Sequence, residues 1–597
     1  MQQGAASAHG GAPRLIDPVC AAPRVRPIRR RSVTMDQYRS RRRGPRKTFH
    51  GRYRTIDPGR AGSRSARGSG GGRSQYVPPR THERRGGRGR RRPLSRNARR
   101  VVSVLVLVVI AATALGVYLL TRPATATITA NPSDSMILFN GSVAGTGTLE
   151  VADLKRGEYT VYVERTGFEP VSSTIEVRQG RHERLSYDLL PLPQQVAVVT
   201  DPEGASVSLS HDGSIAHQGQ SPVDIQVPSG LYTLTIELPG YNTFTREMSI
   251  DTTTTLEYHL DPEGQVLHGI GLITTLGAPK GVSVTHDGSE AWTSILNGPP
   301  SIQIFDPRTG EILGGVDIGE HGAVEVIFNR SGTLAYTSQM ETAKCFEIDV
   351  ATRAVLREFD TGSAWTKCVE LSPDEKTLYA SNWSGDDVSI IDLETGELVR
   401  RIGVSNTPRG MYATGDGRSL YVAGFDSGHL EHIDLESGEV TTLFTGGGAL
   451  RHIVADETTG RLFISDMADD LVWVHDMATG STTKFVETDE KPNTIDLTPD
   501  GKMLFVSCRG ENNEKTYYLP GPEWGSILVF DTTDGRPLDA LIAGNQPTAL
   551  DVSDDGSLLV FSDFLDNRLR VYEIPGYDVF AAAKGGRYDE HFAEIAK

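Results

Sequence analysis

A short pattern recurs at nearly constant spacing through the C-terminal half of this chain. An apolar stretch ends in an aspartate and a turn in FDPRTG, IDVATR, IDLETG, IDLESG, HDMATG and FDTTDG, at Asp306, Asp349, Asp392, Asp434, Asp476 and Asp531. The spacings are 43, 43, 42, 42 and 55 residues. Further turns precede strand-like segments at Gly288, Gly332, Glu375, Gly417, Gly460, Gly501 and Gly556. A period near 43 residues with four strand-like segments per unit predicts β-propeller blades.

One unit shows how the repeat builds a blade. The expected strands, from the inner to the outer one, are KCVELS (367–372), TLYASN (377–382), VSIIDL (388–393) and LVRRIG (398–403). Because no unit buries its apolar face alone, the units must stack and close into a ring. Seven turn markers predict seven blades. The last unit lacks an outer strand, and QVLHGIGLITTLG (265–277) is expected to supply it and protect the sheet edges.

The best-preserved units carry a family resemblance. LYASNWSGDDVSIIDLETGELV, LYVAGFDSGHLEHIDLESGEV and LFISDMADDLVWVHDMATGS resemble the YVTN-type β-propeller repeat. The similarity extends over 265–575 and implies a seven-bladed propeller. Similar propellers belong to surface-layer proteins, lactonases and redox enzymes, so the resemblance leaves the function open.

Two related units of about 70 residues precede the propeller. EYTVYVERTGF (158–168) and LYTLTIELPGY (231–241) alternate apolar and polar residues, and their equivalent glycines and tyrosines are 73 residues apart. We therefore predict two small β-sandwiches, at 123–192 and 195–262. The second begins DPEGASV (201–207) and resembles the PEGA domain; the first has NPSDSMI (131–137) there, so its resemblance rests on its second half. The resemblance implies spacer or display modules on bacterial surfaces.

An uncharged run, VVSVLVLVVIAATALGVYLL (101–120), separates two parts of opposite charge. As a helix it would span about 30 Å, the hydrocarbon thickness of a bilayer. Arg99 and Arg100 precede it and only Arg122 follows closely, which predicts a single-pass anchor with a cytoplasmic N-terminus and residues 123–597 outside. A cleaved signal peptide and a buried globular helix are the alternatives. The length of the run and the 100 residues before it favour the anchor.

The first 100 residues contain 28 Lys and Arg but 4 Asp and Glu, whereas the remainder contains 33 and 72. Tracts such as RGGRGRRR (85–92) predict a disordered cytoplasmic tail. Such a tail suits contact with anionic lipid headgroups, and RNA binding is the alternative. Met35 is a second candidate start, which would shorten the tail. Residues 576–597 are expected to be a C-terminal tail.

Aligning the blades by their turns brings basic residues to equivalent positions, two or three residues before the inner strands. Lys280, Lys367, Arg409 and Arg451 occupy it in blades one, three, four and five, with His452 adjacent, and Asn493 and Thr548 fill blades six and seven. These side chains are predicted to face the mouth of the central channel. They could bind carboxylates or phosphates of a glycan, a lactone or a polymer. The alternative is that the cations pair with acids of neighbouring blades.

A second candidate site is the insertion RGENNEKTYYLPGPEWG (509–525), which accounts for the longer spacing in blade six. Its Tyr517, Tyr518 and Trp524 suit binding of a sugar or peptide, and packing over the propeller is the alternative. The acidic pairs at 386–387 and 469–470 could hold Ca²⁺ or be simply solvated. HExxH, GxSxG and haem-attachment motifs are absent from the sequence. We expect no cofactor and no metal.

The pattern therefore favours a membrane-anchored bacterial surface protein without catalytic activity. Its propeller is expected to bind a cell-envelope polymer or a protein partner, and the PEGA-like domains are expected to act as spacers. The alternative is a lactonase-like hydrolase carried on the propeller, which acidic metal ligands at the channel mouth would favour. A sensor coupled to the tail is a third hypothesis.

Overall fold

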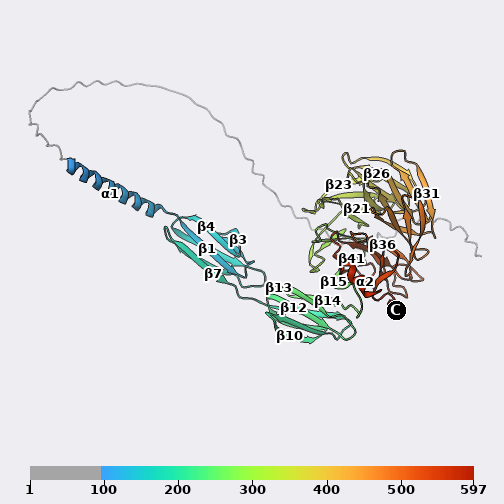
Figure 1. Cartoon of the computed structure of the whole chain (residues 1–597), viewed down its shortest axis with the longest axis horizontal. Coiled ribbons are helices and arrows are strands. Elements are labelled where there is room, and N and C mark those ends of the chain that lie inside the picture. Colours follow the sequence, from blue (N-terminus) through green and yellow to red (C-terminus); the bar gives the residue numbers. More distant parts are fainter. Residues whose placement is uncertain (1–95) are drawn as a thin grey trace, which may run out of the picture. The chain divides into compact units, whose positions relative to one another are not determined.

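The computed structural model describes residues 96–597, which begin with a helix and continue as successive β-sheets (Figure 1). The predictions about the Arg-rich tail and Met35 lie outside the described residues. Helix α1 (Arg96–Thr121) contains the whole uncharged run. Its segment Arg100–Tyr118 has a mean hydropathy of 2.6, and none of it is buried against the rest of the described chain. By length and composition, it is the one helix of the described residues that could cross a membrane.

Two small β-sandwiches of identical topology follow α1. Each pairs a three-stranded sheet with a four-stranded sheet, ordered β4-β1-β7 and β3-β2-β5-β6 in the first domain and β11-β8-β14 and β10-β9-β12-β13 in the second. The strands of the first domain are β1 (Ala124–Asn131), β2 (Met136–Phe139), β3 (Ser142–Thr146), β4 (Thr148–Leu154), β5 (Gly157–Glu164), β6 (Val171–Val177) and β7 (His182–Asp188). Those of the second are β8 (Pro193–Asp201), β9 (Ser206–His211), β10 (Ser214–Gln220), β11 (Val223–Pro228), β12 (Gly230–Glu237), β13 (Phe244–Ile250) and β14 (Thr254–His259).

The alternation seen in the sequence builds the cores of these sandwiches. Tyr232, Leu234 and Ile236 of β12 are buried in the second domain. Val161 and Val163 of β5 have the same place in the first. The first and last strands of each domain pair in parallel, β1 with β7 and β8 with β14. The two domains are thus one fold used twice.

The remaining strands form seven four-stranded antiparallel sheets in the described chain, fanned around one centre (Figure 1). The inner strands of blades one to seven are β16 (Pro279–Val284), β20 (Val326–Phe328), β24 (Thr366–Leu371), β28 (Pro408–Ala413), β32 (Leu450–Asp456), β36 (Pro492–Leu497) and β40 (Pro547–Val552). The second strands are β17 (Ala291–Ile295), β21 (Leu334–Gln339), β25 (Thr377–Asn382), β29 (Ser419–Gly424), β33 (Arg461–Asp466), β37 (Met503–Cys508) and β41 (Leu558–Asp563).

The outer half of each blade completes the sheet. The third strands are β18 (Ile302–Phe305), β22 (Lys344–Asp349), β26 (Asp387–Asp392), β30 (His429–Asp434), β34 (Leu471–Asp476), β38 (Ser526–Asp531) and β42 (Arg568–Glu573). The outer strands are β19 (Ile312–Val316), β23 (Val355–Asp360), β27 (Leu398–Gly403), β31 (Val440–Thr445), β35 (Ser481–Glu487), β39 (Pro537–Ile542) and, for blade seven, β15 (His268–Thr274). The mostly β fold with a seven-bladed propeller, two small β-sandwiches and one apolar helix is therefore as predicted.

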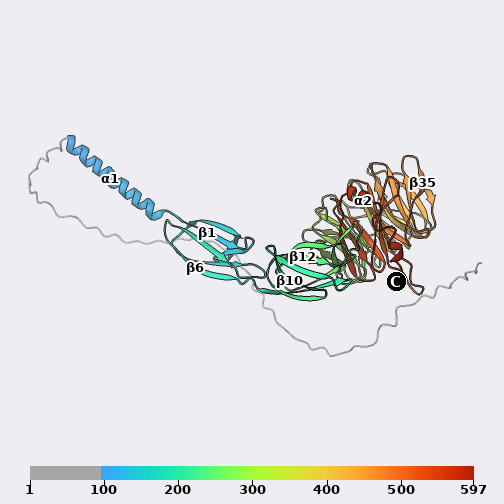
Figure 2. The ribbon, with the colours of Figure 1, turned by 60° about the horizontal axis from the view of Figure 1, so that its bottom comes forward.

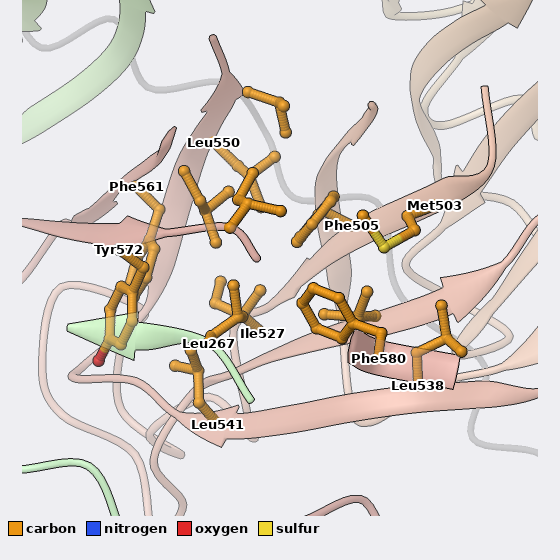
Figure 3. Packing of buried hydrophobic residues seen from close by; sticks show 14 of the residues in the cluster. Leu267, Met503, Phe505, Ile527, Leu538, Leu541, Leu550, Phe561, Tyr572 and Phe580 are labelled. Atoms are coloured by element: carbon orange, nitrogen blue, oxygen red, sulfur yellow. The ribbon is translucent and has the colours of Figure 1, made fainter. Parts of the chain in front are cut away.

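The ring closes by strand exchange, as the sequence led us to expect. β15 comes from the start of the propeller and pairs antiparallel with β42 from its end. Figure 3 shows the core at this junction, where Leu267, just before β15, packs with Phe561 and Tyr572. Leu267 and Phe561 are fully buried. Both ends of the chain thus contribute to one hydrophobic core, which hides sheet edges that would otherwise be free to pair with other chains.

The C-terminal residues pack on the propeller. Helix α2 (Tyr577–Ala583) is labelled on the propeller in Figure 2. It contacts β39 and buries Phe580 in the junction core (Figure 3). The short helix η1 (His591–Ala593) follows. The imidazole Nε2 of His591 lies 3.0 Å from an Asp489 carboxylate oxygen, and both side chains are buried. Ala596 then bridges to Glu523 at the end of the blade-six insertion. The expected tail is therefore a packed segment joined to the insertion.

Six of the seven inner strands share one irregularity that shapes the channel. Their register with the second strand shifts between the first and fourth residues, as between Thr366 and Val369 of β24. The same shift occurs in β16, β28, β32, β36 and β40. Such a bulge adds one residue and re-aims the local side chains. It lets both the second and third positions of the inner strands line the central cavity.

Serine hydroxyls of the second strands hold these bulges and link neighbouring blades. Ser381 Oγ accepts a hydrogen bond from the Cys368 amide at 3.2 Å and donates one to the Arg409 carbonyl of the next blade at 2.9 Å. Ser294 and Ser465 make the equivalent pairs of bonds in blades one and five. The backbone that carries the basic residues is therefore fixed from both sides.

Candidate functional site

The structure brings all five residues predicted at the channel to one cavity. Lys280, Lys367, Arg409, Arg451 and His452 line a space of about 150 Å³, which residues from all seven blades enclose. Each of the four cations is the second residue of its inner strand. The prediction placed them before the strands, and this detail is wrong because the strands start earlier, ahead of the bulge. His452 lies one position further along, inside the bulge of β32.

Burial distinguishes this site from the open channel mouth expected from the sequence. The side chains of Lys367, Arg409 and Arg451 keep only 5%, 6% and 8% of their surface exposed, and Lys280 is half-buried. None of the four forms an ion pair with a described residue. The alternative reading, in which the cations pair with acids across blades, is thus not what the described residues show. Burying charges without partners is strongly unfavourable.

Buried polar atoms without a hydrogen-bond partner are concentrated among these residues and their neighbours. In the described part of the chain, eight buried side-chain nitrogen or oxygen atoms have no hydrogen-bond partner in the protein. Five of them belong here: Nε of Arg409, Arg451 and Arg509, and both amide atoms of Asn493. Buried polar groups in folded proteins are otherwise almost always satisfied. This concentration therefore points to a polar ligand rather than to a structural network.

Aromatic side chains that directly follow the second strands lie against the cations. The Lys367 Nζ lies 4.2 Å from the centre of the Trp383 ring, and the Arg409 guanidinium lies 5.1 Å from the same ring. Lys280 Nζ lies 5.0 Å from the Phe564 ring. Such contacts offset about 0.5–2 kcal/mol of the desolvation of a cation. They leave its charge uncompensated.

Arg509 is a fifth cation, which the sequence reasoning missed. It directly follows the second strand of blade six, where blades three, four and seven have Trp383, Phe425 and Phe564. Its guanidinium donates to the Gln546 side chain and lies 5.8 Å from the Tyr517 ring. An alignment by the ends of the second strands, in addition to the turns, would have identified it. We call Lys280, Lys367, Arg409, Arg451 and Arg509 the cationic cluster.

The insertion loop divides between this site and the C-terminal segment. The Tyr517 carbonyl accepts from Gln546 at 2.7 Å, and the Tyr517 ring lies near Arg509. The rings of Tyr517 and Tyr518 are in contact, tilted by 33° with their centres 4.1 Å apart, and both are half-exposed. Trp524 lies instead under the Lys597 ammonium at 4.5 Å, and its amide donates to the Ile595 carbonyl. Only the tyrosines thus belong with the cationic cluster.

The charges of the cationic cluster perturb one another. Burial and then the Arg409 charge lower the pKa of Lys367 to about 7. Burial and the charges of Arg509, Lys367 and Arg409 hold the pKa of Lys280 well below its usual value. Burial lowers the pKa of His452 to about 4, so its ring is neutral at pH 7. Its Nδ1 donates to the Ile495 carbonyl at 3.0 Å, which leaves Nε2 as an acceptor.

Carboxyl groups occupy the fifth position of three inner strands, three residues after the position that the cations occupy in theirs. We call these two positions the acidic and the cationic level of the channel. Each carboxyl group accepts a hydrogen bond from a backbone amide of the next blade: Glu370 from Ala413 at 3.3 Å, Asp496 from Val552 at 2.8 Å and Asp551 from Val284 at 2.7 Å. Burial raises the pKa of Glu370 to about 8 and raises that of Asp551. We call Glu370, Asp496 and Asp551 the acidic set. Their contacts give them a structural role between blades.

The acidic loop pairs considered for Ca²⁺ have similar contacts. Asp386 Oδ1 accepts from the Thr407 amide at 3.0 Å, and Asp470 Oδ1 accepts from the Lys491 amide at 2.7 Å. Asp387 forms an ion pair with Arg401 at 2.8 Å. Within residues 96–597, no group of three or more His, Cys, Asp or Glu is placed to hold a metal ion. Cys345, Cys368 and Cys508 are all free thiols.

Comparison with protein families recovers both parts of the fold. The PEGA domain family matches residues 124–192 and 194–264, so both sandwiches are PEGA domains, including the one that departs from the motif. The family described as "Lactonase, 7-bladed beta-propeller" matches residues 331–448, which hold Lys367 and Arg409. These domains fit a surface protein.

Individual proteins are similar to parts of the chain. The "Antigen Lp49" of Leptospira interrogans (serogroup Icterohaemorrhagiae, serovar copenhageni, strain Fiocruz L1-130) is 36% identical over 264 residues, which are 43% of this chain and 58% of that protein. The chain thus spans somewhat over half the length of this relative. A solved structure titled "Kuenenia stuttgartiensis Hydrazine Synthase" matches with a TM-score of 0.43 and 19% identity, over 51% of this chain and 97% of that one.

Proposed function

We propose that this protein is a membrane-anchored bacterial surface protein whose propeller binds an anionic group of a cell-envelope polymer or protein partner in the cationic cluster. One observation carries the binding proposal: buried Arg409 and Arg451 have no acidic partner among the described residues and keep unsatisfied Nε atoms directed at one cavity. An anion would supply the acceptors that these guanidinium groups lack and would form charge-assisted hydrogen bonds with them.

The anchor is part of the same proposal. α1 is long and apolar enough to span a bilayer, and Arg99 and Arg100 precede its apolar run. The positive-inside rule then puts the N-terminus in the cytoplasm and the PEGA domains and propeller outside. The tail could contact anionic lipid headgroups, the PEGA domains would act as spacers, and the blades would be of the YVTN type. Added protease should degrade the propeller and spare the tail in cells with a permeable outer layer; the reverse result would refute this topology.

Binding is tested with the full chain in detergent and fractionated envelope polymers. We expect saturable binding that Lys367→Met with Arg409→Met abolishes. The matched control is Lys344→Met, because Lys344 pairs with Glu358 at 2.8 Å on the outer part of blade two. Binding that survives the double variant would move the site to the tyrosines of the insertion or to the PEGA domains.

The second candidate function is a lactonase-like hydrolase. The match of residues 331–448 to the lactonase family favours it. Neutral His452, with a free Nε2 in the cavity, is the residue to test as a general base. Hydrolysis of a panel of lactones that His452→Gln abolishes would support the hydrolase. Equal turnover by the variant and the natural chain would rule out this role for His452.

A further inference from the structure

The size of the cavity limits what can reach the cationic cluster. Its volume of about 150 Å³ is enough for several water molecules or for one small anion. The rings of Trp383, Phe425 and Phe564 lie over the cations, within 5.5 Å of Arg409 or Lys280. This space suits a small free ion or the terminal group of a longer molecule.

The charge of the cationic cluster sets the charge of the ligand. The cluster has five basic side chains, and Glu325 of blade two is a lining acid whose charge interacts with Arg409, Lys280 and Lys367. Burial raises the pKa of Glu325, which favours its neutral form. Because the pKa values of Lys280 and Lys367 are lowered, the three arginines carry most of the charge, and a ligand with one negative charge would leave most of it uncompensated. A ligand with two or more charges would balance it.

The direction of the donors distinguishes between classes of anion. Unsatisfied N–H groups come from blades four, five and six, on Arg409, Arg451, Asn493 and Arg509. The ammonium groups of Lys280 and Lys367 come from blades one and three. Of these residues, Lys280, Lys367, Arg409 and Arg451 line the cavity itself, so its basic donors come from four of the seven blades. A planar carboxylate offers acceptors in one plane, whereas a tetrahedral oxyanion offers them in all directions and forms forked bonds with arginine.

We infer that the cavity binds one phosphate group, either as a free phosphate or pyrophosphate ion or as the phosphomonoester end of an envelope polymer. The inference rests on the proposed function, because it uses the same cavity, and it narrows the ligand from any anionic polymer to a terminal or free phosphate. A carboxylate within a glycan chain has one charge and planar acceptors, which match this set of donors less well. The polymer, where there is one, binds end-on.

Isothermal titration of the full chain in detergent micelles tests the inference. We expect one phosphate or pyrophosphate per chain and an affinity at least about tenfold above that for acetate, as for hydrogen bonds to charged groups. Lys367→Met should weaken phosphate binding by roughly ten- to a hundredfold. Lys344→Met should leave it unchanged. Arg451→Gln is a second cluster variant with the same expected loss.

Thermal unfolding separates loss of the site from loss of the fold. Lys367→Met removes a buried, unpaired charge, so the variant without ligand should melt at or above the temperature of the natural chain. Phosphate should raise the melting temperature of the natural chain and not that of the variant. A variant that melts lower and still gains the full phosphate-dependent rise would overturn the inference.

Polymer fragments distinguish the two sources of phosphate. If the ligand is a chain end, a fragment with a terminal phosphomonoester binds, phosphatase treatment abolishes its binding, and inorganic phosphate competes with it. If the ligand is a free ion, inorganic phosphate binds and both fragments are inert. Should neither phosphate, pyrophosphate nor the phosphorylated fragment bind while a carboxylated polymer does, and Lys367→Met abolishes that, the proposed function stands and this inference falls. No binding of any anion would refute both.

Discussion

The two levels of the propeller channel bury charge in opposite ways. Four residues of the cationic cluster occupy the second position of their inner strands, and the acidic set occupies the fifth position; blade three has both, in Lys367 and Glu370. Each acid accepts a backbone hydrogen bond from the next blade. Of the five cations, only Arg509 hydrogen-bonds a described side chain, and that bond leaves its Nε unpaired. The level of the acidic set is therefore complete within the fold, and the level of the cationic cluster requires a ligand.

This difference in hydrogen bonding shows which of the buried ionisable groups have a structural role. A carboxylate beside an open strand edge can accept an amide proton of the neighbouring blade, so its burial stabilises the ring. A guanidinium or ammonium group needs acceptors, and the nearby backbone carbonyls of Lys367, Arg409 and Asn493 already accept from serine hydroxyls. Substitutions at the two levels should therefore change stability with opposite signs.

The largest effect is expected at the acidic level, where Asp551 joins blade seven to blade one. Asp551→Ala leaves the Val284 amide without its acceptor and should lower the free energy of unfolding of the propeller by about 1–3 kcal/mol. Asp551→Asn keeps an acceptor oxygen and should recover most of this loss. Denaturant titration followed by tryptophan fluorescence measures both. Equal losses in the two variants would mean that the bond to Val284 is not what Asp551 supplies.

The pH dependence of stability gives the next effect. The pKa of Glu370 is raised from 4.5 to about 8 by burial first and by the Glu325 charge as well. The folded chain thus binds more protons than the unfolded chain across this range. Stability from Glu370 is present below pH 4.5 and is lost as the pH rises toward 8, by at most about 1.4 kcal/mol per pH unit.

Glu370→Gln should therefore flatten the decline in stability between pH 5 and pH 8, as measured by thermal unfolding in a pH series. The contribution of Lys367 to the pH dependence of stability has the opposite sign. Because its pKa is lowered to about 7, stability rises from pH 7 toward pH 10.5. Lys367→Met should remove that rise. Unchanged pH profiles in both variants would contradict the comparison between the two levels.

A smaller effect of opposite sign is expected in the cationic cluster. Arg451→Met removes a buried guanidinium with an unsatisfied Nε and keeps an apolar stem of similar length. The free energy of unfolding without added anions should stay equal or rise by about 1 kcal/mol. Chemical denaturation in a phosphate-free buffer measures it. A loss as large as that of Asp551→Ala would show that Arg451 is a structural residue.

The smallest effect on stability is expected in the insertion. Tyr517 is 45% exposed, so Tyr517→Ala should change stability by less than about 0.5 kcal/mol. Because its ring lies beside Arg509, its loss should speed the release of a bound anion several-fold, as stopped-flow kinetics would show. Phe592→Ala is the matched control, since Phe592 is 54% exposed and packs on Tyr588 and His591 instead. Equal release rates in Tyr517→Ala and the natural chain would show that Tyr517 is not part of the binding site.

Much of the fold could be predicted because the blades repeat. In blade three, the second strand is Thr377–Asn382 and the outer strand Leu398–Gly403 in both prediction and structure, and the other two differ by one residue. Alternation and turns set these bounds locally. The first PEGA domain was harder to recognise, because NPSDSMI replaces its usual motif, while its strand pairing is unchanged.

The sequence by itself determined the period of the blades and the strand that closes the ring. It also determined that Lys280, Lys367, Arg409 and Arg451 occupy equivalent positions, because repeats that stack around one axis bring equal positions together. Only the tertiary structure decided that these cations are buried without acidic partners, that Arg509 joins them, and that Tyr517 lies beside them. These contacts join loops of unlike sequence from different blades. Local patterns carry no information about which of such loops meet, since closure of the ring sets those distances.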